Sequence, residues 1–288
     1  MIKKFKLLKK FIEKKDPYLI KRIIRGVYEN FLRLVFKFSF HKGIKILDEE
    51  WKYLILLDAC RYDEFKRINW IKGNLKKKIS LGSNTPEWLR KNFKKSCKDI
   101  IYVAGNPQMS KIIRKDIFNN FFKIEKVWDY GWNFKLNTVL PNKLTKATLK
   151  LSKKYPDKRF IIHYLQPHAP YINPNTKDPE LVKRMEVIQD NVLFGNLDIK
   201  KVKRAWQENL KFVLKEIDKN LIPKIKGKII ITADHGEAFG EKFLYFHPEA
   251  IYTKELIEVP WLIINKPNSR NKEQNKKRIE KVIESLKI

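Results

Sequence analysis

Residues 53–58 read YLILLD, a run of five large apolar side chains that ends on an aspartate. A short continuous apolar run of this kind is typical of a strand buried on both faces of a parallel sheet. Four further runs have the same character and are predicted as strands: 100–103 (IIYV), 160–164 (FIIHY), 229–232 (IIIT) and 259–264 (VPWLII). Helical patterns lie between them or follow them, at about 86–95, 142–154, 179–190, 200–220 and 271–286. Strands that alternate with helices predict an α/β fold with a mostly parallel sheet.

The composition narrows the class of protein. The chain has 288 residues, 43% of them hydrophobic, which excludes a wholly disordered chain and allows a sizeable core. Lys and Arg number 63 against 32 Asp and Glu, and the net charge of +31 favours anionic partners such as phosphorylated substrates, anionic lipid or nucleic acid. Two cysteines cannot form a disulfide scaffold, and no apolar run reaches the roughly 18 residues of a transmembrane helix. We therefore expect a cytoplasmic protein.

The first 46 residues differ from the rest of the chain. They carry 14 Lys and Arg against three acidic residues, and apolar residues recur at helical spacing along 18–40. We divide the chain into this basic amphipathic segment, 1–46, and a second unit, 47–288, that holds the predicted strands. Two interpretations of the segment stay open: residues 1–40 contact an anionic membrane peripherally, or the helix packs on its own domain with its lysines in water.

Histidines follow the predicted strands. Four of the five lie at strand ends or just beyond them: His163, His168, His235 and His247. Because ligands of parallel α/β sheets bind at the carboxyl ends of the strands, this placement predicts a functional site rather than core packing.

Two carboxylates close buried strands, Asp58 and Asp234, and His235 is adjacent to the second. A buried carboxylate is costly unless it is paired, caps a helix or binds a metal. Two strand-end carboxylates with an imidazole make a mixed oxygen and nitrogen ligand set that suits a divalent ion such as Zn²⁺ or Mn²⁺. Taken singly, each aspartate could instead cap the helix that follows it.

A candidate nucleophile lies in SNTPEW, residues 83–88. Pro86 is expected in the first turn of a helix, which makes Thr85 the predicted N-cap. A hydroxyl there lies at the positive end of the helix, where a phosphate also binds, and coordination to a metal would make it nucleophilic. Ser83 is the alternative nucleophile, and an ordinary cap is the alternative role of Thr85.

Five segments, in this order, resemble the alkaline phosphatase/sulfatase-like superfamily: LLDACRYDEF (56–65), SNTPEW (83–88), HYLQPHAPY (163–171), TADHGEAFGE (232–241) and FHPEAIYTKELIEVPWLI (246–263). The most specific of them are Asp-His-Gly-Glu after a strand and then a histidine before an apolar Val-Pro strand. The resemblance spans about residues 50–265. It implies a three-layer sandwich, a mostly parallel central sheet with helices on both faces, and makes 47–288 an alkaline phosphatase-like catalytic domain with a metal site at the strand ends.

The resemblance also implies roles for individual residues. It assigns Asp58, Asp234 and His235 to one divalent metal ion and Thr85 to the nucleophile. His247 and the catalytic candidate His168 would bind a second metal ion or the oxyanion of the substrate.

Substrate binding is predicted for three further residues, Arg61, His163 and Ser83. Arg61 could hold a phosphate bidentately, and a salt bridge with Asp63 or Glu64 is an equal alternative. Glu237 and Glu241 could cap or orient His235 without binding the metal ion themselves.

Two features of the family are missing from the chain. The Cys-x-Pro-Ser-Arg motif of sulfatases is absent, which disfavours a conventional sulfatase, and Tyr164 stands where two-metal phosphatases need an aspartate. One tight metal site with a weaker second one is therefore expected. The sequence predicts a metal-dependent hydrolase or transferase of phosphate esters with a threonine nucleophile. The alternatives are hydrolysis of sulfate esters, or nucleic-acid binding without catalysis, although no nucleic-acid recognition motif predicts specific binding.

Overall fold

The structure of the protein is a computed structural model, and it describes residues 17–37, 42–107, 120–172 and 178–266. The long strands are β1 (Tyr53–Leu57), β2 (Asn74–Ile79), β3 (Cys97–Ala104), β4 (Phe121–Lys126), β7 (Arg159–Tyr164), β8 (Gly227–Thr232) and β11 (Glu258–Lys266). Short strands form two small sheets: β5 (Trp132–Asn133) with β6 (Thr138–Val139), and β9 (Ala238–Phe239) with β10 (Tyr245–Phe246). The helices are α2 (Pro17–Lys37), α3 (Tyr62–Ile68), α4 (Thr85–Asn92), α7 (Trp128–Gly131), α8 (Pro141–Lys154), α9 (Met185–Phe194), α10 (Ile199–Glu216) and α11 (Lys254–Ile257).

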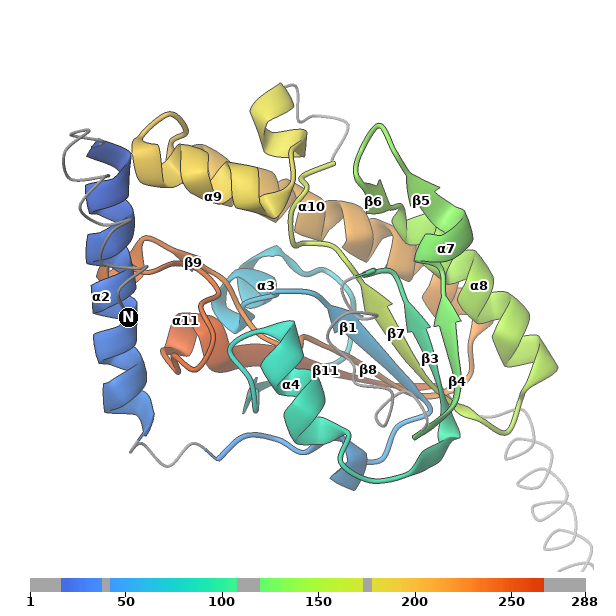
Figure 1. The fold of residues 1–288 in the computed structure, drawn as a ribbon. Helices are drawn as coiled ribbons and strands as arrows, with labels where there is room; N and C mark the ends of the chain where they lie inside the picture. Colours follow the sequence, from blue (N-terminus) through green and yellow to red (C-terminus); the bar gives the residue numbers. More distant parts are fainter. Residues whose placement is uncertain (1–16, 38–41, 108–119, 173–177, 267–288) are drawn as a thin grey trace, which may run out of the picture.

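The long strands form one seven-stranded sheet in the order β2–β11–β8–β1–β7–β3–β4 (Figure 1). From β8 to β4 neighbouring strands are parallel, and β11 runs antiparallel between β8 and β2. Because β1 pairs with β7 on one side and with β8 on the other, the carboxyl ends of these three strands meet at the middle of one sheet edge. The ligand site of such a sheet is expected there.

Successive residues of the central strands face opposite layers of helices. On β1, Ile55 joins a buried cluster with Trp206 of α10, whereas Leu54 and Leu56 join a second cluster with Trp88 of α4. The period of two in a strand sends side chains to both faces, so a strand between two helical layers is apolar throughout. The α/β class and the three-layer sandwich predicted from the sequence are confirmed.

The five predicted strands are present as β1, β3, β7, β8 and β11. The two edge strands of the sheet, β2 and β4, are not among the predicted strands. Their sequences, NLKKKI and FFKIEK, carry lysines, as edge strands often do, and the lysines hide the apolar pattern.

One predicted helix is wrong in its bounds. Instead of a helix over 179–190, a 3₁₀ turn (Pro179–Val182) comes first, and α9 begins only at Met185. The reason is the extended backbone of Lys183 and Arg184, which separates the two elements. The helix predicted at 271–286 lies outside the described residues.

The N-terminal segment contains the helix α2, which lies along the side of the domain (Figure 1). Tyr28, Leu32 and Phe36 pack on a small buried cluster that includes Leu244 and Leu256. One face of α2 therefore packs on the domain, as one of the two interpretations expects. The division of the chain at residue 46 stays a prediction. Within the described residues, no helix is both long and apolar enough to cross a membrane.

Candidate active site

Three strand ends bring two aspartates and a histidine together. Asp58 follows β1 directly, His163 lies near the end of β7, and Asp234 lies two residues beyond β8. All three are buried, and each offers a ligand atom within 4.8 Å of those of the other two. The pairing of β1 with both β7 and β8 produces this convergence. For the two aspartates, it is the arrangement that the sequence predicts.

The two aspartates differ in how well hydrogen bonds satisfy them. Asp234 Oδ1 accepts from the backbone N–H groups of Ala59 (3.3 Å) and His235 (3.0 Å). Asp58 Oδ2 accepts from the amide of Asn106 at 3.3 Å, whereas its Oδ1 has no hydrogen-bond partner among the described residues. Because a buried carboxylate oxygen without a partner is costly, Asp58 is suited to a bound cation.

The charges around the aspartates shift their pKa values in opposite directions. Burial raises the pKa of Asp58, and the carboxylates of Asp234 and Glu237 raise it further. Burial also opposes ionisation of Asp234, but the neighbouring histidines, His235 and His163, outweigh it and lower the pKa. In the described part of the chain, no lysine or arginine forms an ion pair with either aspartate. The cluster therefore lacks a counter-charge that a divalent metal ion would supply.

Thr85 lies beside this cluster at the start of α4. Its hydroxyl donates to Asp234 Oδ2 at 2.6 Å, and Oγ1 lies 3.3 Å from His235 Nε2. The predicted N-cap is wrong by one residue, because Asn84 is the N-cap and its side chain accepts from the backbone N–H of Glu87. Since Asn84 satisfies the helix end, the Thr85 hydroxyl is free to bond to the aspartate.

Three histidines share one hydrogen-bond pattern. In each, Nδ1 donates to an oxygen that can only accept: His235 to the Gly236 carbonyl (2.8 Å), His168 to the Ala169 carbonyl (2.6 Å) and His247 to Glu237 Oε1 (2.8 Å). The proton of each neutral ring is therefore on Nδ1, and Nε2 keeps its lone pair. This is the tautomer that binds a metal ion through Nε2.

The histidine rings lie close together but differ in basicity. The ring centroid of His247 is 4.7 Å from that of His235 and 5.1 Å from that of His168. Burial, together with His247, lowers the pKa of His168 to about 4, so this ring is neutral at pH 7. Burial also opposes protonation of His247, but Glu237 outweighs it and raises the pKa.

These side chains border a cavity of about 350 Å³. Asp58, Thr85, His168 and His247 line it, together with residues 184–186 at the start of α9. A cavity of this size is in the range of small-molecule sites. Four residues predicted from separate sequence motifs thus open onto one space, whereas the fully buried Asp234 and His235 do not line it.

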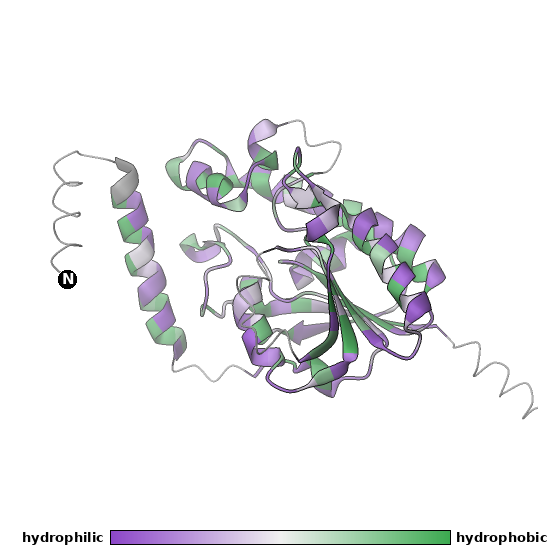
Figure 2. Cartoon of the chain, turned by 45° about the vertical axis from the view of Figure 1, so that its right-hand side comes forward, coloured by the Kyte–Doolittle hydropathy of each residue, from purple (hydrophilic) through white to green (hydrophobic). Residues whose placement is uncertain are grey.

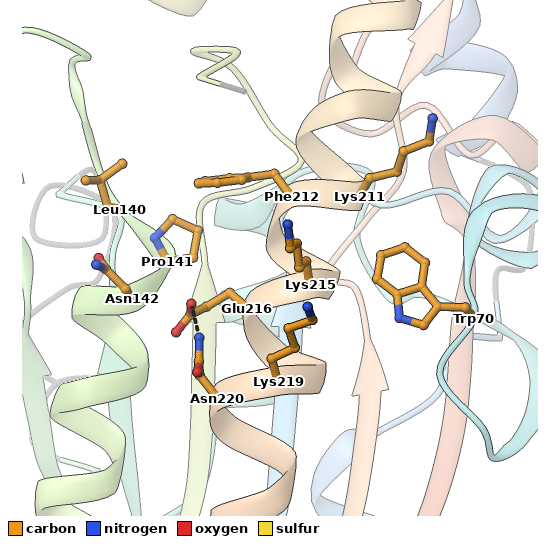
Figure 3. Close-up of a pocket in the computed structure, with 10 residues that line it drawn as sticks. All are labelled: Trp70, Leu140, Pro141, Asn142, Lys211, Phe212, Lys215, Glu216, Lys219 and Asn220. Carbon is orange, nitrogen blue, oxygen red and sulfur yellow. Dashed lines mark hydrogen bonds between the residues drawn. The ribbon is translucent and has the colours of Figure 1, made fainter. Parts of the chain in front are cut away.

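A larger cavity, of about 680 Å³, contains none of the predicted site residues (Figure 3). Among those that line it are Trp70, residues 140–142, the α10 side chains Lys211 and Lys215, and Lys219 of the turn that follows α10. Among the described residues that line it, the lysines offer positive charge, but no side chain could serve as a nucleophile next to a metal ligand. The smaller cavity is therefore the candidate active site.

The Asp-His-Gly order of residues 234–236 has a packing reason. A Cβ atom on Gly236 would lie 2.1 Å from the carbonyl oxygen of Glu255 in α11. The Gly236 N–H also donates to the carbonyl of Leu256 at 2.8 Å. Only glycine allows this close approach, which keeps the backbone next to His235 packed against α11.

The predicted substrate ligands are placed differently from one another. The Arg61 guanidinium donates to both oxygens of Asp63 (2.9 and 2.7 Å) and to Glu241 (2.6 Å). Of its two predicted roles, the structure contains the salt bridge with Asp63. The expectation that Glu237 and Glu241 orient His235 is wrong, because Glu237 bonds to His247 and Glu241 to Arg61.

Ser83 and His163, two other predicted substrate ligands, are not among the residues that line the cavity. The Ser83 hydroxyl lies 2.9 Å from the Pro248 carbonyl and 3.1 Å from Glu87 Oε2, away from the aspartate cluster. His163 is fully buried, with Nε2 3.6 Å from Asp234 Oδ2, and belongs to the ligand cluster rather than to the cavity lining.

Two residues of the site were missed from the sequence. Asn106, which donates to Asp58, follows the apolar run of β3, so the rule that site residues follow strands could have found it. The Tyr102 hydroxyl lies 2.8 Å from His163 Nδ1 inside the second buried cluster, and an aromatic residue within a strand gives no such signal.

Comparison with solved structures places this fold among known ones. The soluble domain of lipooligosaccharide phosphoethanolamine transferase A from Neisseria meningitidis matches with a TM-score of 0.53 and 14% identity, over 73% of this chain and 75% of that domain. The chain has the same fold as this transferase domain.

The intact integral membrane form of the same transferase matches this chain with a TM-score of 0.55 and 14% identity. The match covers 76% of this chain and 48% of the membrane protein, so the chain corresponds to about half of that protein. A scan against protein-family models and a search of curated proteins give no match.

Proposed function

We propose that this protein is a metal-dependent hydrolase or transferase of phosphate esters that uses Thr85 as its nucleophile. The observation that carries the proposal is the position of Thr85 Oγ1, 2.6 Å from Asp234 Oδ2 and 3.3 Å from His235 Nε2, on the wall of the cavity. The fold matched above is one whose named member, the Neisseria enzyme, transfers phosphoethanolamine.

The residues present fit a divalent metal ion. Asp58 Oδ1 and His163 Nε2 are buried without hydrogen-bond partners among the described residues, and the tautomer of His235 leaves Nε2 with a lone pair. Together with Asp234, these side chains would hold a Zn²⁺ or Mn²⁺ ion. A weaker second ion would use His247 and His168, where the buried Glu237 Oε2 is also without a partner in the described structure. A bound ion would supply positive charge that lowers the pKa of the Thr85 hydroxyl.

The side chains of the protein would then carry the reaction. Asp234 accepts the hydrogen bond of the Thr85 hydroxyl and would take its proton as Oγ1 bonds to phosphorus. The bond from phosphorus to the leaving oxygen breaks in the same step, and solvent water would protonate the departing alkoxide. His168 and His247 lie on the same cavity wall and would orient the phosphate oxygens. Water or an acceptor alcohol releases the phosphoryl group from Thr85 in the second step.

Sulfate esters are the second candidate substrate. In a variant of the main proposal, the substrate is a lipid-linked phosphate ester. Residues 1–40 would then bind the anionic membrane that contains it. The cytoplasmic location expected from the composition stays a prediction.

The test combines metal content with turnover. Pure protein would be stripped with EDTA, reloaded with Zn²⁺ or Mn²⁺, and assayed on phosphate monoesters, phosphate diesters and sulfate esters. Thr85→Ala should lower turnover by several orders of magnitude, and Thr85→Ser should keep part of it, because the attacking oxygen survives. Ser83→Ala is the matched control and should stay active.

The covalent intermediate gives a second readout. Mass spectrometry of the acid-quenched enzyme should find phosphate on the peptide that contains Thr85. Turnover that survives Thr85→Ala and depends on metal would show that water attacks directly. If Ser83→Ala abolishes turnover and Thr85→Ala does not, Ser83 and not Thr85 is the nucleophile.

A further inference from the structure

The helix α2 carries most of the exposed large apolar side chains of the described residues. Seven of the thirteen such side chains belong to it, although it has only 21 residues. Figure 2 shows hydrophobic residues recurring along this helix at the side of the domain. Contiguous exposed apolar surface of this kind marks an interaction site.

Five of these side chains form one continuous stripe. They are 57–64% exposed and follow the spacing i, i+4, i+7, i+11 and i+14 of a single helix face: Ile20, Ile24, Val27, Phe31 and Leu34. We call them the apolar stripe. Its spacing sets it apart from scattered surface hydrophobics, which need no explanation.

The stripe is not the face that attaches α2 to the domain. Tyr28, Leu32 and Phe36 make that attachment, and they lie on a different side of the helix. The Tyr28 hydroxyl donates to the carbonyl of Lys242 (2.9 Å), and the Arg33 guanidinium to the carbonyl of Glu249 (3.0 Å). The domain therefore holds α2 in place while the stripe stays exposed.

An apolar groove of about 360 Å³ continues the stripe onto the domain. Ile24 of the stripe, Leu193 of α9, and Phe243, whose exposure is 80%, are among the side chains that line it. Lys21 and Arg25 stand at the same groove. Apolar surface with cations at its border extends beyond the helix itself.

The positive charge of the chain indicates which kind of partner suits the apolar stripe and the groove. The first 46 residues have a net charge of +11 and the whole chain +31, so a second copy of the chain would be repelled. An amphipathic helix with basic residues at the border of its apolar face is suited to the interface of an anionic bilayer, where the apolar residues enter the acyl region and the cations meet the headgroups. We propose that the apolar stripe of α2 and the adjoining groove dock on an anionic phospholipid membrane.

Docking would place the membrane next to the candidate active site. The contacts of Tyr28 and Arg33 hold α2 to the stretch 242–249, which carries His247. Only this consequence rests on the proposed function. The membrane contact itself is independent of catalysis and is measured without a substrate.

The experiment is flotation of the full chain with lipid vesicles. We expect binding to vesicles of phosphatidylcholine with 30% phosphatidylglycerol, loss of binding in high salt, and little binding to phosphatidylcholine alone. The double variant Val27→Glu with Phe31→Glu should bind the anionic vesicles at least about tenfold more weakly. Phe134→Glu, which replaces an equally large side chain of 85% exposure elsewhere, is the matched control and should bind as the parent does.

Two further measurements identify what contacts the apolar stripe if the protein does not bind the vesicles. The melting temperature of the double variant should equal that of the parent, and a fall of several degrees would mean that the chain itself covers the stripe. Light scattering should find a monomer, and a dimer that the double variant abolishes would assign the stripe to a second copy. Either result, or flotation that the double variant does not weaken, overturns the proposal. Turnover of a soluble ester by the double variant should be unchanged, so failure of docking and failure of the proposed chemistry remain distinguishable.

Discussion

Replacement of Asp58 by asparagine should stabilise the metal-free protein and destabilise the metal-loaded one. In the structure Asp58 is 1% exposed, its Oδ1 has no hydrogen-bond partner among the described residues, and Asp234 lies nearby. Asparagine keeps the shape and can accept from Asn106 as Asp58 Oδ2 does. It removes a buried charge, and its NH₂ group can donate toward Asp234.

The size of the effect follows from these contacts. A hydrogen bond to a charged group contributes about 1.5–3 kcal/mol, so we expect Asp58→Asn to raise the free energy of unfolding in EDTA by about 2 kcal/mol. For a chain of this size that is a rise of roughly 4–8 °C in melting temperature. With Zn²⁺ at about 100 times its Kd, the parent should gain about 2.7 kcal/mol, whereas the variant has lost a carboxylate ligand and should gain much less.

The pH dependence has a defined sign. Because burial and Asp234 raise the pKa of Asp58 in the folded protein, the folded state binds a proton that the unfolded state has lost, and stability in EDTA falls as pH rises through the folded pKa. The advantage of Asp58→Asn should therefore be small at low pH and grow as the pH rises through the folded pKa of Asp58.

The assay is thermal and urea unfolding in EDTA and in Zn²⁺, from pH 5 to pH 8. Asp129→Asn, the same change at an exposed position, is the control and should alter neither condition. If Zn²⁺ stabilises Asp58→Asn as much as the parent, Asp58 is not a metal ligand. If the variant is less stable than the parent in EDTA at pH 8, the charge of Asp58 is compensated without a metal ion.

Two other predictions concern stability. Gly236→Ala should lower the free energy of unfolding by at least about 2 kcal/mol in urea titrations, because its Cβ would meet the Glu255 carbonyl at 2.1 Å; Gly26→Ala, with nothing within 4 Å, should instead raise it by about 0.5–1 kcal/mol, and equal effects would contradict the packing argument. Glu87→Gln should cost about 1–2 kcal/mol at pH 7, since burial opposes ionisation of Glu87 but hydrogen bonds from Lys91, Ser83 and Tyr252 outweigh it and lower its pKa. That cost should shrink as pH falls through the folded pKa of Glu87, and a cost that persists in acid would refute the assignment.

The apolar runs of the sequence determined the class of fold because each central strand is buried on both faces. The run at residues 53–57 is recognisable without tertiary information, since a strand between two helical layers is apolar at every position and the run is too short for a buried helix. The edge strands β2 and β4 were not recognisable, because their lysines face water and resemble any solvated segment. Their place in the sheet depends on pairing with β11 and β3.

The same division holds for the candidate site. The positions of Asp58 and Asp234 at strand ends predicted that they meet, because parallel strands end at one edge. The sequence could not choose between the two roles of Arg61, since the partners Asp63 and Glu241 lie 2 and 180 positions away along the chain. It could not show that Asn84, rather than Thr85, caps α4, because both side chains have cap chemistry and differ only in backbone geometry.

The sequence by itself determined which residues are candidates for chemistry, and the tertiary structure decided which of them share a space. The identities of Asp58, Thr85, Asp234 and the histidines follow from residue type and from position relative to apolar runs, which are local properties. Only the folded chain places Thr85 2.6 Å from Asp234 across 149 positions, and only it separates the face of α2 that packs on the domain from the face that stays exposed. Hydrogen bonds and burial depend on which residues lie within a few ångströms in space, whereas a sequence pattern reports only residues that are close along the chain. The two sets of neighbours are the same only within one helix or strand.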